Sequence, residues 1–439
     1  MKRFPVESAI PPGPSSPARR TVITGIGSVA PVGVGRGALW KALLSGKSAI
    51  RAIDRFDASS LSCRVAGQVA DDEFFPLLTS RTIRTAPRVS QFALAAAALA
   101  TEDARLQEGA YAPSRRAVVV GTAVAGWADA EAQVGLMLER GARRINPFIV
   151  SGAASHGPGA EVAALLGAQG PQLTIANGCP SALEAIRLGS LLIQAGVADL
   201  CVAGGAEAPL SPSVFASLCR TQELSTLNED PSLSSCPFDR RHSGIVLSEG
   251  ACFVVLEEAA AAAERAGAPL AEVLGGESSC DAKGLYRIDQ TGDVAAQGIF
   301  RLLSRYGLSA KDIDYVCSHA NSSPTFDDKE SAVLRIALRG AGSAPAISSI
   351  KGVLGHPFGA SGAFQVAAGS LAISTQIVPP NTNLREAAVG DLTANLPVVP
   401  TARSVKNVLV TGYGYGGVNS CLLLGSIYIR SNGRLPNAS

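Results

Sequence analysis

The sequence of 439 residues has no strong excess of one charge and no long apolar run. Its 38 Lys and Arg nearly balance its 36 Asp and Glu, and the formal net charge of +2 leaves no broad basic field that would attract nucleic acid. No apolar stretch reaches the length of a membrane span, so we expect no membrane segment. The nine cysteines form an odd set without a C-x-x-C pair, which argues against disulfides and zinc and favours a reduced, cytoplasmic protein.

Histidine is also scarce. The sequence contains His156, His242, His319 and His356, and their spacings match no metal motif such as H-E-x-x-H. The sequence therefore predicts no metal site.

Short β-branched runs alternate with alanine-rich helical stretches, which indicates an α/β fold with buried strands. The two halves share this rhythm, which predicts an internal duplication. The predicted strands are 21–26, 117–120, 173–176, 200–203, 252–256, 271–274, 313–317, 346–350, 408–411 and 420–424. The predicted helices are 37–44, 90–104, 180–195, 294–306, 328–339 and 362–375. We expect an N-terminal tail (1–20), two similar halves (21–265 and 266–430) and a C-terminal tail (431–439).

Cys179 stands where an apolar strand gives way to an apolar helix, in I-A-N-G-C-P-S-A-L-E-A-I at 175–186. Pro180 fits the first helical position and Gly196 fits a glycine cap at the other end. We therefore expect Cys179 at a helix N-terminus, where the dipole would lower the pKa of its thiol and favour nucleophilic attack. Position alone fits a nucleophile and a packed core cysteine about equally well.

Further polar groups follow predicted strands. His319 comes after I-D-Y-V-C-S, Lys351 after A-P-A-I-S-S-I, and His356 ends the turn K-G-V-L-G-H. Functional groups in α/β sheets gather beyond the carboxyl ends of the strands. The sequence thus predicts that one sulfur, two imidazoles and an ammonium share one pocket.

Taken together, these segments resemble the elongating β-ketoacyl-acyl-carrier-protein synthases, which are thiolase-fold condensing enzymes. The match runs from T-V-I-T-G-I-G-S-V-A-P-V-G at 21 to G-Y-G-Y-G-G-V-N at 412–419. Between them lie Cys179 with S-A-L-E-A-I, P-F-D at 237–239, E-G-A at 249–251, H-x-x-S-S-P-x-x-D-x-x-E at 319–330 and I-K-G-V-L-G-H-P-F-G-A-S-G at 350–362. The resemblance implies an α/β thiolase-like fold of two similar βαβαβαββ halves in a layered αβαβα arrangement.

The resemblance also implies a mechanism. Cys179 would take an acyl group from a carrier-protein thioester, and a malonyl-type extender would lose CO2 and attack that acyl group. His319 and His356 would hydrogen-bond the thioester oxygen of the extender, and Lys351 would orient His319. The backbone N–H groups of Cys179 and Tyr415 would form an oxyanion hole.

Other family roles are implied at several further positions. They give a gating loop (Tyr413, Gly414, Tyr415, Gly416 and Gly417), an acyl pocket (Val124 and Trp127), pantetheine-binding residues (Asn321 and Ser323) and arginines that dock the carrier (Arg81, Arg84, Arg143 and Arg144). No bound cofactor is implied, because the phosphopantetheine arm arrives on the acyl carrier protein. The resemblance predicts a homodimer, with a heterodimer with a related subunit as the alternative.

The sequence departs from the family pattern around these positions. The departures are Asn177-Gly178 for Thr-Ala, Pro180 for a small residue, Ala320-Asn321 for Gly-Thr, His242-Ser243 for Arg-Asp, and Gln365 for the acidic partner of the lysine. Because all four catalytic side chains remain, the sequence favours a specialised synthase of fatty-acid or polyketide metabolism. Two alternatives stay open, namely an acyltransferase that moves the cysteine-bound acyl group without decarboxylation, and a non-catalytic heterodimer partner.

Overall fold

The computed structural model describes residues 19–341 and 345–427. Most of the predicted N-terminal tail (1–20) and all of the predicted C-terminal tail (431–439) lie outside the described residues. Arg19 and Arg20, at the end of the predicted N-terminal tail, are described and form ion pairs with Asp199 and Glu272. These pairs hold the entry to the first strand against its neighbours.

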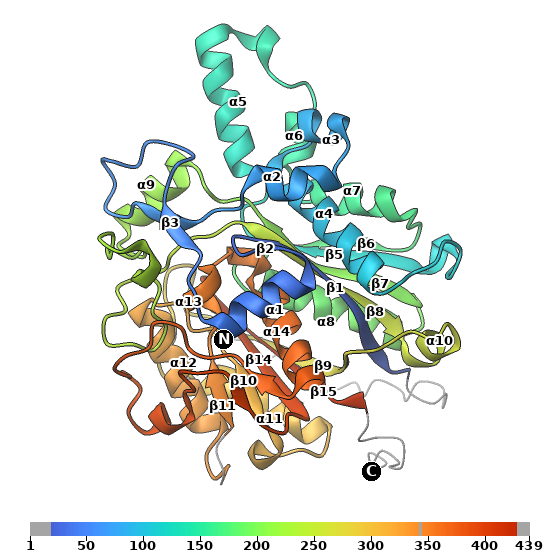
Figure 1. Ribbon diagram of the computed structural model, residues 1–439, viewed down its shortest axis with the longest axis vertical. Helices are drawn as coiled ribbons and strands as arrows, with labels where there is room; N and C mark the ends of the chain where they lie inside the picture. The colour runs from blue at the N-terminus through green and yellow to red at the C-terminus, as the bar shows by residue number, and fades with distance from the viewer. Residues whose placement is uncertain (1–18, 342–344, 428–439) are drawn as a thin grey trace, which may run out of the picture.

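The strands and helices follow one another as the apolar pattern predicts (Figure 1). The strands are β1 (Thr21–Ala30), β2 (Gly33–Val34), β3 (Ile50–Ala52), β4 (Val65–Gly67), β5 (Arg116–Gly121), β6 (Gln172–Ile175), β7 (Leu200–Glu207), β8 (Gly250–Glu258), β9 (Ala271–Cys280), β10 (Tyr315–Cys317), β11 (Ala346–Ser348), β12 (Ile377–Val378), β13 (Thr401–Ala402), β14 (Asn407–Gly414) and β15 (Val418–Gly425). The helices are α1 (Gly35–Ser45), α2 (Asp71–Phe74), α3 (Ser80–Thr85), α4 (Arg88–Asp103), α5 (Trp127–Arg140), α6 (Ile149–Ala153), α7 (Gly157–Leu166), α8 (Ser181–Gln194), α9 (Pro212–Arg220), α10 (Ala259–Glu264), α11 (Asp293–Arg305), α12 (Pro324–Ala337), α13 (Lys351–Leu354) and α14 (Ser361–Thr375).

Each predicted strand and helix is present with shifted bounds, and several elements were not predicted. The largest of these is α5, which projects from the body at the upper end of Figure 1 and has no buried residue. It therefore lacks the core-facing apolar stripe by which a sequence reveals a helix. None of the helices in the described part of the chain is long and apolar enough to cross a bilayer.

The predicted duplication is confirmed by the order of the strands. The sheet runs β11-β10-β14-β15-β9-β1-β8-β7-β5-β6, so each half has its five main strands in the same order when read inward from its own edge. In both halves the outer three strands are parallel and the inner two are antiparallel to their neighbours. The halves join where β1 pairs with β9, Thr21 lying opposite Val273.

The layers follow from which strand faces are apolar. In β8, Cys252, Val254 and Leu256 face the core that contains α8 and α14, whereas Phe253 and Val255 face the core under α4 and α7. The C-terminal strands likewise have α11 and α12 on their outer side. The chain thus forms the layered αβαβα arrangement that the sequence predicts.

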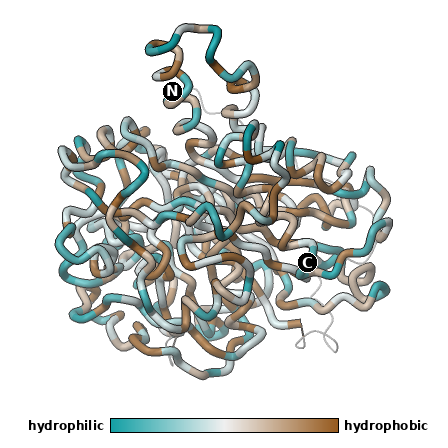
Figure 2. Tube along the Cα trace, turned by 45° about the horizontal axis from the view of Figure 1, so that its top comes forward, coloured by the Kyte–Doolittle hydropathy of each residue, from teal (hydrophilic) through white to brown (hydrophobic). Residues whose placement is uncertain are grey.

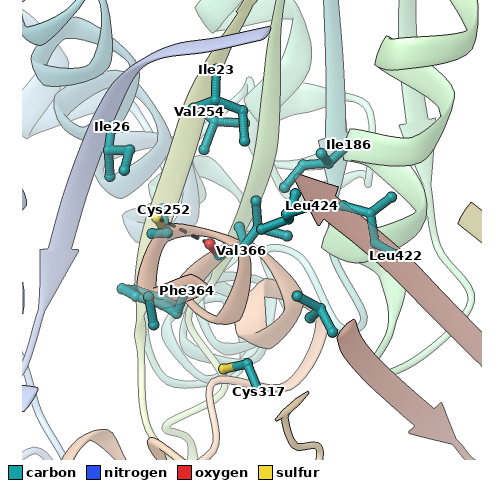
Figure 3. Packing of buried hydrophobic residues seen from close by; sticks show 14 of the residues in the cluster. Ile23, Ile26, Ile186, Cys252, Val254, Cys317, Phe364, Val366, Leu422 and Leu424 are labelled. Atoms are coloured by element: carbon teal, nitrogen blue, oxygen red, sulfur yellow. Dashed lines mark hydrogen bonds between the residues drawn. The ribbon is translucent and has the colours of Figure 1, made fainter. Parts of the chain in front are cut away.

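Small residues let the two central helices approach closely. A side chain at Gly362 of α14 would place its Cβ 2.6 Å from the backbone nitrogen of Leu183 in α8. The Cys252 Sγ donates to the Ala363 carbonyl at 3.6 Å, and Figure 3 shows this contact among the apolar side chains of both halves. Figure 2 shows apolar segments running through the interior of the body. This dry middle layer fixes the ends of the strands that carry the site.

Candidate active site

Polar side chains from both halves meet at the carboxyl ends of the parallel strands. Cys179 lies between β6 and α8, His319 follows β10, and Lys351 begins α13 after β11. The Cys179 Sγ lies 3.2 Å from the His356 Nε2. The rings of His356 and His319 are 5.5 Å apart and nearly perpendicular, and the Lys351 Nζ donates to the His319 carbonyl at 2.7 Å. The structure thus brings all four predicted side chains together.

The prediction that the pKa of the Cys179 thiol is lowered was wrong. Pro180 caps α8, which begins at Ser181, so the sulfur does lie at the helix N-terminus as expected. Burial nevertheless raises the pKa of the thiol to about 12, because the lost hydration of the thiolate outweighs the nearby charge of Lys351. Cys179 is therefore a thiol at rest, and it needs a base before it can attack.

The two histidines are neutral at rest. Burial, followed by the positive charge of Lys351, lowers the pKa of both imidazoles well below 6.5. Both rings are buried, and within the described part of the chain neither the His319 Nε2 nor the His356 Nδ1 has a hydrogen-bond partner. A neutral imidazole can accept a proton at one nitrogen and donate from the other, so both rings can serve as bases or as hydrogen-bond donors to a ligand.

Lys351 contacts the backbone of His319 and not its ring. Burial lowers the pKa of Lys351 to about 8, although nearby acidic groups, led by Cys317 and Glu330, oppose this shift. Glu330, a carboxylate among these groups, is the last residue of the H-x-x-S-S-P-x-x-D-x-x-E motif. Glu330 accepts a hydrogen bond from Thr411 at 2.8 Å, and burial raises its pKa to about 7.

The sequence placed Gln365 where the family has an acidic partner of Lys351, but none of the hydrogen bonds that Gln365 makes within the described residues goes to Lys351. The Gln365 Nε2 donates to the backbone carbonyls of Cys317, Ser318 and Thr411 at 2.9–3.1 Å. Two of these carbonyls lie at the end of β10 and the third lies within β14, so Gln365 ties together the strands that carry His319 and the glycine-rich loop.

The glycine-rich loop at 413–417 packs directly against the nucleophile. A side chain at Gly414 would place its Cβ 2.9 Å from Pro180 and 3.3 Å from the Cys179 nitrogen, so only glycine permits this approach. Gly416 and Gly417 have φ of +86° and +74°. Burial and then the charge of Glu330 raise the pKa of the Tyr413 hydroxyl, and burial also raises the pKa of Tyr415. Both tyrosines are therefore neutral.

The predicted pantetheine residues lie beside His319. Asn321 and Ser323 are buried, and the Asn321 Oδ1 accepts the Ser323 N–H at 3.1 Å. Asp327 holds this turn by accepting the N–H groups of Asn321 and Ser322. The Asn321 Nδ2 is buried and has no hydrogen-bond partner among residues 19–341 and 345–427, and the same is true of the Asn177 Oδ1. These atoms are free to bind a polar ligand.

The other predicted residues lie farther out. Val124 is half-buried in the turn after β5, whereas Trp127 is 56% exposed and its Nε1 donates to Ser213 at 3.0 Å. In the chain alone, Trp127 is thus a surface residue, and its role in an acyl pocket stays a prediction. The four predicted docking arginines are exposed, Arg81 and Arg84 on α3 and Arg143 and Arg144 in the short helix Ala142–Arg144 after α5.

Sequence reasoning missed a second buried acid, Glu207, at the end of β7. Its carboxylate accepts hydrogen bonds from both sides of the site, and burial raises its pKa to about 7. The signal was an acidic residue closing the apolar strand L-C-V-A-G-G-A-E. Within the described ranges, no cluster of three or more His, Cys, Asp or Glu could hold a metal ion.

A duplicated thiolase-like fold with a cysteine, two histidines and a lysine at one pocket defines a condensing enzyme, and comparison with known proteins agrees. Residues 18–262 match the Beta-ketoacyl synthase N-terminal domain and residues 270–385 match the corresponding C-terminal domain. The chain belongs to the β-ketoacyl synthase family, a family of ketosynthase condensing enzymes, as the sequence predicts.

Individual relatives cover nearly the whole chain. A polyketide beta-ketoacyl synthase 1 of Streptomyces halstedii is 35% identical over 93% of this chain and 98% of its own. The 3-oxoacyl-[acyl-carrier-protein] synthase 2 of Coxiella burnetii is 32% identical over 93% of this chain and 99% of its own. The solved ishigamide ketosynthase/chain length factor superimposes with a TM-score of 0.86 at 28% identity, covering 93% of this chain and 100% of that one.

Proposed function

We propose that the protein catalyses decarboxylative Claisen condensation of an acyl group on Cys179 with a malonyl-type extender. The contact of 3.2 Å between the Cys179 Sγ and the His356 Nε2 carries this proposal. It pairs a protonated nucleophile with a neutral base in a buried site, which is the arrangement that nucleophilic catalysis by cysteine requires.

In the first step the thiol proton passes to the His356 Nε2 while Sγ attacks the thioester carbonyl of the acyl donor. The backbone N–H groups of Cys179 and Tyr415 hold the developing oxyanion. The carbon–sulfur bond to the donor breaks, the departing thiolate takes the proton from His356, and Cys179 keeps the acyl group. His356 is then neutral again for the second step.

In the second step the extender binds with its thioester oxygen toward the two imidazoles. The bond between its α-carbon and carboxylate breaks, CO2 leaves, and the electron pair forms an enolate that the imidazole N–H groups stabilise. The enolate carbon attacks the acyl carbonyl, the carbon–sulfur bond to Cys179 breaks, and the thiolate takes up one proton from solvent. The buried, unpartnered His319 Nε2 supports its role as a donor in this step, and Lys351 holds the His319 backbone in place.

The substrates would arrive on the phosphopantetheine arm of an acyl carrier protein, the substrate carrier named for the relative from Coxiella burnetii. The partnerless Asn321 Nδ2 and the adjacent Ser323 would bind the arm. Val124 and Trp127 would line the acyl pocket, and the gating loop at 413–417 would open it. An acidic carrier would dock on the exposed docking arginines of α3 and of the short helix after α5.

We also propose a dimer in the cytoplasm, formed by two copies of this chain or by this chain and a related subunit. Strand β6 supports this, since it is one of the two edge strands of the sheet within the described residues and its Leu173 is 38% exposed. The ishigamide ketosynthase/chain length factor makes a related partner the natural alternative to a second copy.

The test is mass spectrometry of the intact protein after incubation with acyl-carrier thioesters, combined with measurement of CO2 release from a malonyl-carrier substrate. We expect an acyl adduct that the variant Cys179→Ala lacks, and CO2 release that depends on prior acylation. An adduct without CO2 release would identify an acyltransferase. No adduct with any donor would identify a non-catalytic partner, and either result would refute the proposal.

A further inference from the structure

The Glu207 carboxylate accepts hydrogen bonds from an unusually large number of donors. Its side chain is fully buried at the end of β7. The Oε1 accepts the Thr122 hydroxyl at 2.9 Å and the N–H groups of Val124 and Ala125 at 3.1 Å. The Oε2 accepts the N–H groups of Ala123 at 2.6 Å and of Gly359 at 2.9 Å. The carboxylate thus satisfies five donors.

These donors belong to two segments far apart in the sequence. Thr122, Ala123, Val124 and Ala125 form the turn after β5, which we call the acyl turn because Val124 is its proposed pocket residue. Gly359 belongs to the short helix Phe358–Ala360, which follows His356. The His356 and Phe358 rings lie 5.7 Å apart. Glu207 therefore connects the acyl turn to the segment that carries the catalytic base.

Both segments are held in backbone conformations that side chains disfavour. Ala125 has φ of +49° and Phe358 has φ of +33°, in the region that residues other than glycine rarely adopt. Such conformations persist where the surroundings determine them. The N–H groups of Ala125 and of Gly359, which follows Phe358, both donate to Glu207. The carboxylate therefore helps to hold both segments in these conformations.

The two segments also lack room to shift. A side chain at Gly359 would place its Cβ 2.5 Å from the Ala123 nitrogen, so the turns touch through their backbones. A side chain at Gly205, two residues before Glu207, would place its Cβ 2.8 Å from the Gly121 carbonyl. A displacement of the acyl turn would therefore push against the segment that carries His356. A displacement of that segment would likewise push against the acyl turn.

The other half of the duplicated fold uses the same device. There the fourth main strand is β14, and its Thr411 hydroxyl accepts the His319 N–H at 3.0 Å, in the turn after β10. Strands β7 and β14 are topological equivalents, as are β5 and β10. In both halves, a side chain of the fourth strand pins the turn after the second strand, and in the C-terminal half that turn carries a catalytic histidine.

We propose that Glu207 is a positioning residue that fixes the acyl turn against the His356 segment and thereby determines which acyl chains Cys179 accepts. This inference rests on the proposed function, because it takes Val124 to line the acyl pocket. Within the described residues none of the hydrogen bonds of Glu207 involves a reacting atom, and Glu207 acts through the two segments that it joins.

The test compares acylation of Cys179 by acetyl, hexanoyl, decanoyl and tetradecanoyl thioesters of pantetheine, followed by intact mass. The variant Glu207→Gln keeps the shape of the side chain but turns an amide N–H2 toward backbone donors on one side. We expect the ratio of the acylation rates for short and long donors to change on the order of tenfold, since a buried donor that loses its acceptor is strongly disfavoured.

Glu257→Gln is the matched control. Glu257 is also a fully buried carboxylate, with Thr24, Tyr111 and Arg265 as its partners, and it lies at the opposite end of the β7–β8 pair. We expect this variant to lower stability and leave the chain-length ratio unchanged. An equal ratio in both variants and the wild type would overturn the inference, whereas absence of acylation in the wild type would overturn the proposed function instead.

A second variant covers the case in which Glu207→Gln does not fold. Thr122→Val removes one hydroxyl donor to Glu207, and the same hydroxyl also accepts the Ala125 N–H at 3.0 Å. We expect faster amide hydrogen exchange in a peptide spanning the acyl turn and a smaller change of the chain-length ratio in the same direction. Faster exchange with an unchanged ratio would show that Glu207 only stabilises the fold.

Discussion

Raising the pH should increase alkylation of Cys179 well beyond the point at which an ordinary thiol levels off. Burial raises the pKa of this thiol from 9.0 to about 12, which disfavours the thiolate by about 4 kcal/mol. At about pH 7, on the order of one molecule in a hundred thousand would hold the free thiolate. Iodoacetamide reacts with the thiolate, so its rate reports this population.

The assay is the rate of iodoacetamide addition to the Cys179 peptide, measured by mass spectrometry from about pH 7 to about pH 10. We expect the rate to rise across the whole range, whereas an unstructured cysteine peptide levels off above its pKa of about 8.5. Cys201, fully buried in the central core, is an internal control, because it stays unmodified while the protein remains folded.

The variant His356→Phe distinguishes the effect of the base on the alkylation rate from the effect of burial. It removes the Nε2 that lies 3.2 Å from the sulfur, so we expect slower alkylation than in the wild type near neutral pH and convergence at high pH. A plateau below about pH 9 in the wild type would refute the reasoning. It would mean that the helix N-terminus and Lys351 stabilise the thiolate more than burial disfavours it.

Three further predictions concern the packing and the charges around the site. Gly121→Ala should lower the free energy of unfolding by about 3 kcal/mol, measured in urea, because its Cβ would lie 2.4 Å from the Ser181 carbonyl carbon. Gln365→Glu should lower the free energy of unfolding by about 2–3 kcal/mol in the same assay, because it places a carboxylate oxygen instead of an amide donor among three carbonyls. An unchanged urea midpoint would contradict the assigned hydrogen bonds. Burial lowers the pKa of His242, but the hydrogen bond to Asp327 at 3.0 Å outweighs burial and raises the pKa above 6.5. The stabilisation by this pair is therefore complete below about pH 6.5 and is lost as the pH rises through the folded-state pKa of His242. His242→Arg should flatten the urea midpoint between about pH 6 and about pH 8, and an equal slope in both proteins would show that another group titrates there.

The fold could be predicted largely because its strands are buried on both faces. Such strands read as short continuous apolar runs, as C-F-V-V-L in β8 does. The convergence of Cys179, His319 and Lys351 followed from the rule that polar groups gather where parallel strands end. Helix α5 could not be predicted in this way, since it has no buried face to impose a period on the sequence.

The chemistry of the site was less predictable than its location. The pKa of Cys179 depends on how fully the glycine-rich loop and the histidine turns cover it, and these segments lie more than a hundred residues away. The same holds for Gln365, whose partners are backbone carbonyls of β10 and β14 and leave no trace in side-chain identity. Local sequence shows which groups are present, but their protonation depends on contacts that only the fold creates.

Burial disfavours the charged form of each of the four groups in the resting site. The same loss of hydration keeps Cys179 protonated and both imidazoles neutral, and it brings the pKa of Lys351 down to about 8. Cys179 and the two imidazoles thus hold little charge until substrate arrives, and charge develops on them only as the thiol proton moves to His356 and as the enolate forms. In a buried site such charge is stabilised only by donors that are already in place. Hydrogen bonds that hold backbone, as those of Lys351, Gln365 and Glu207 do, therefore matter to this site as much as the groups that react.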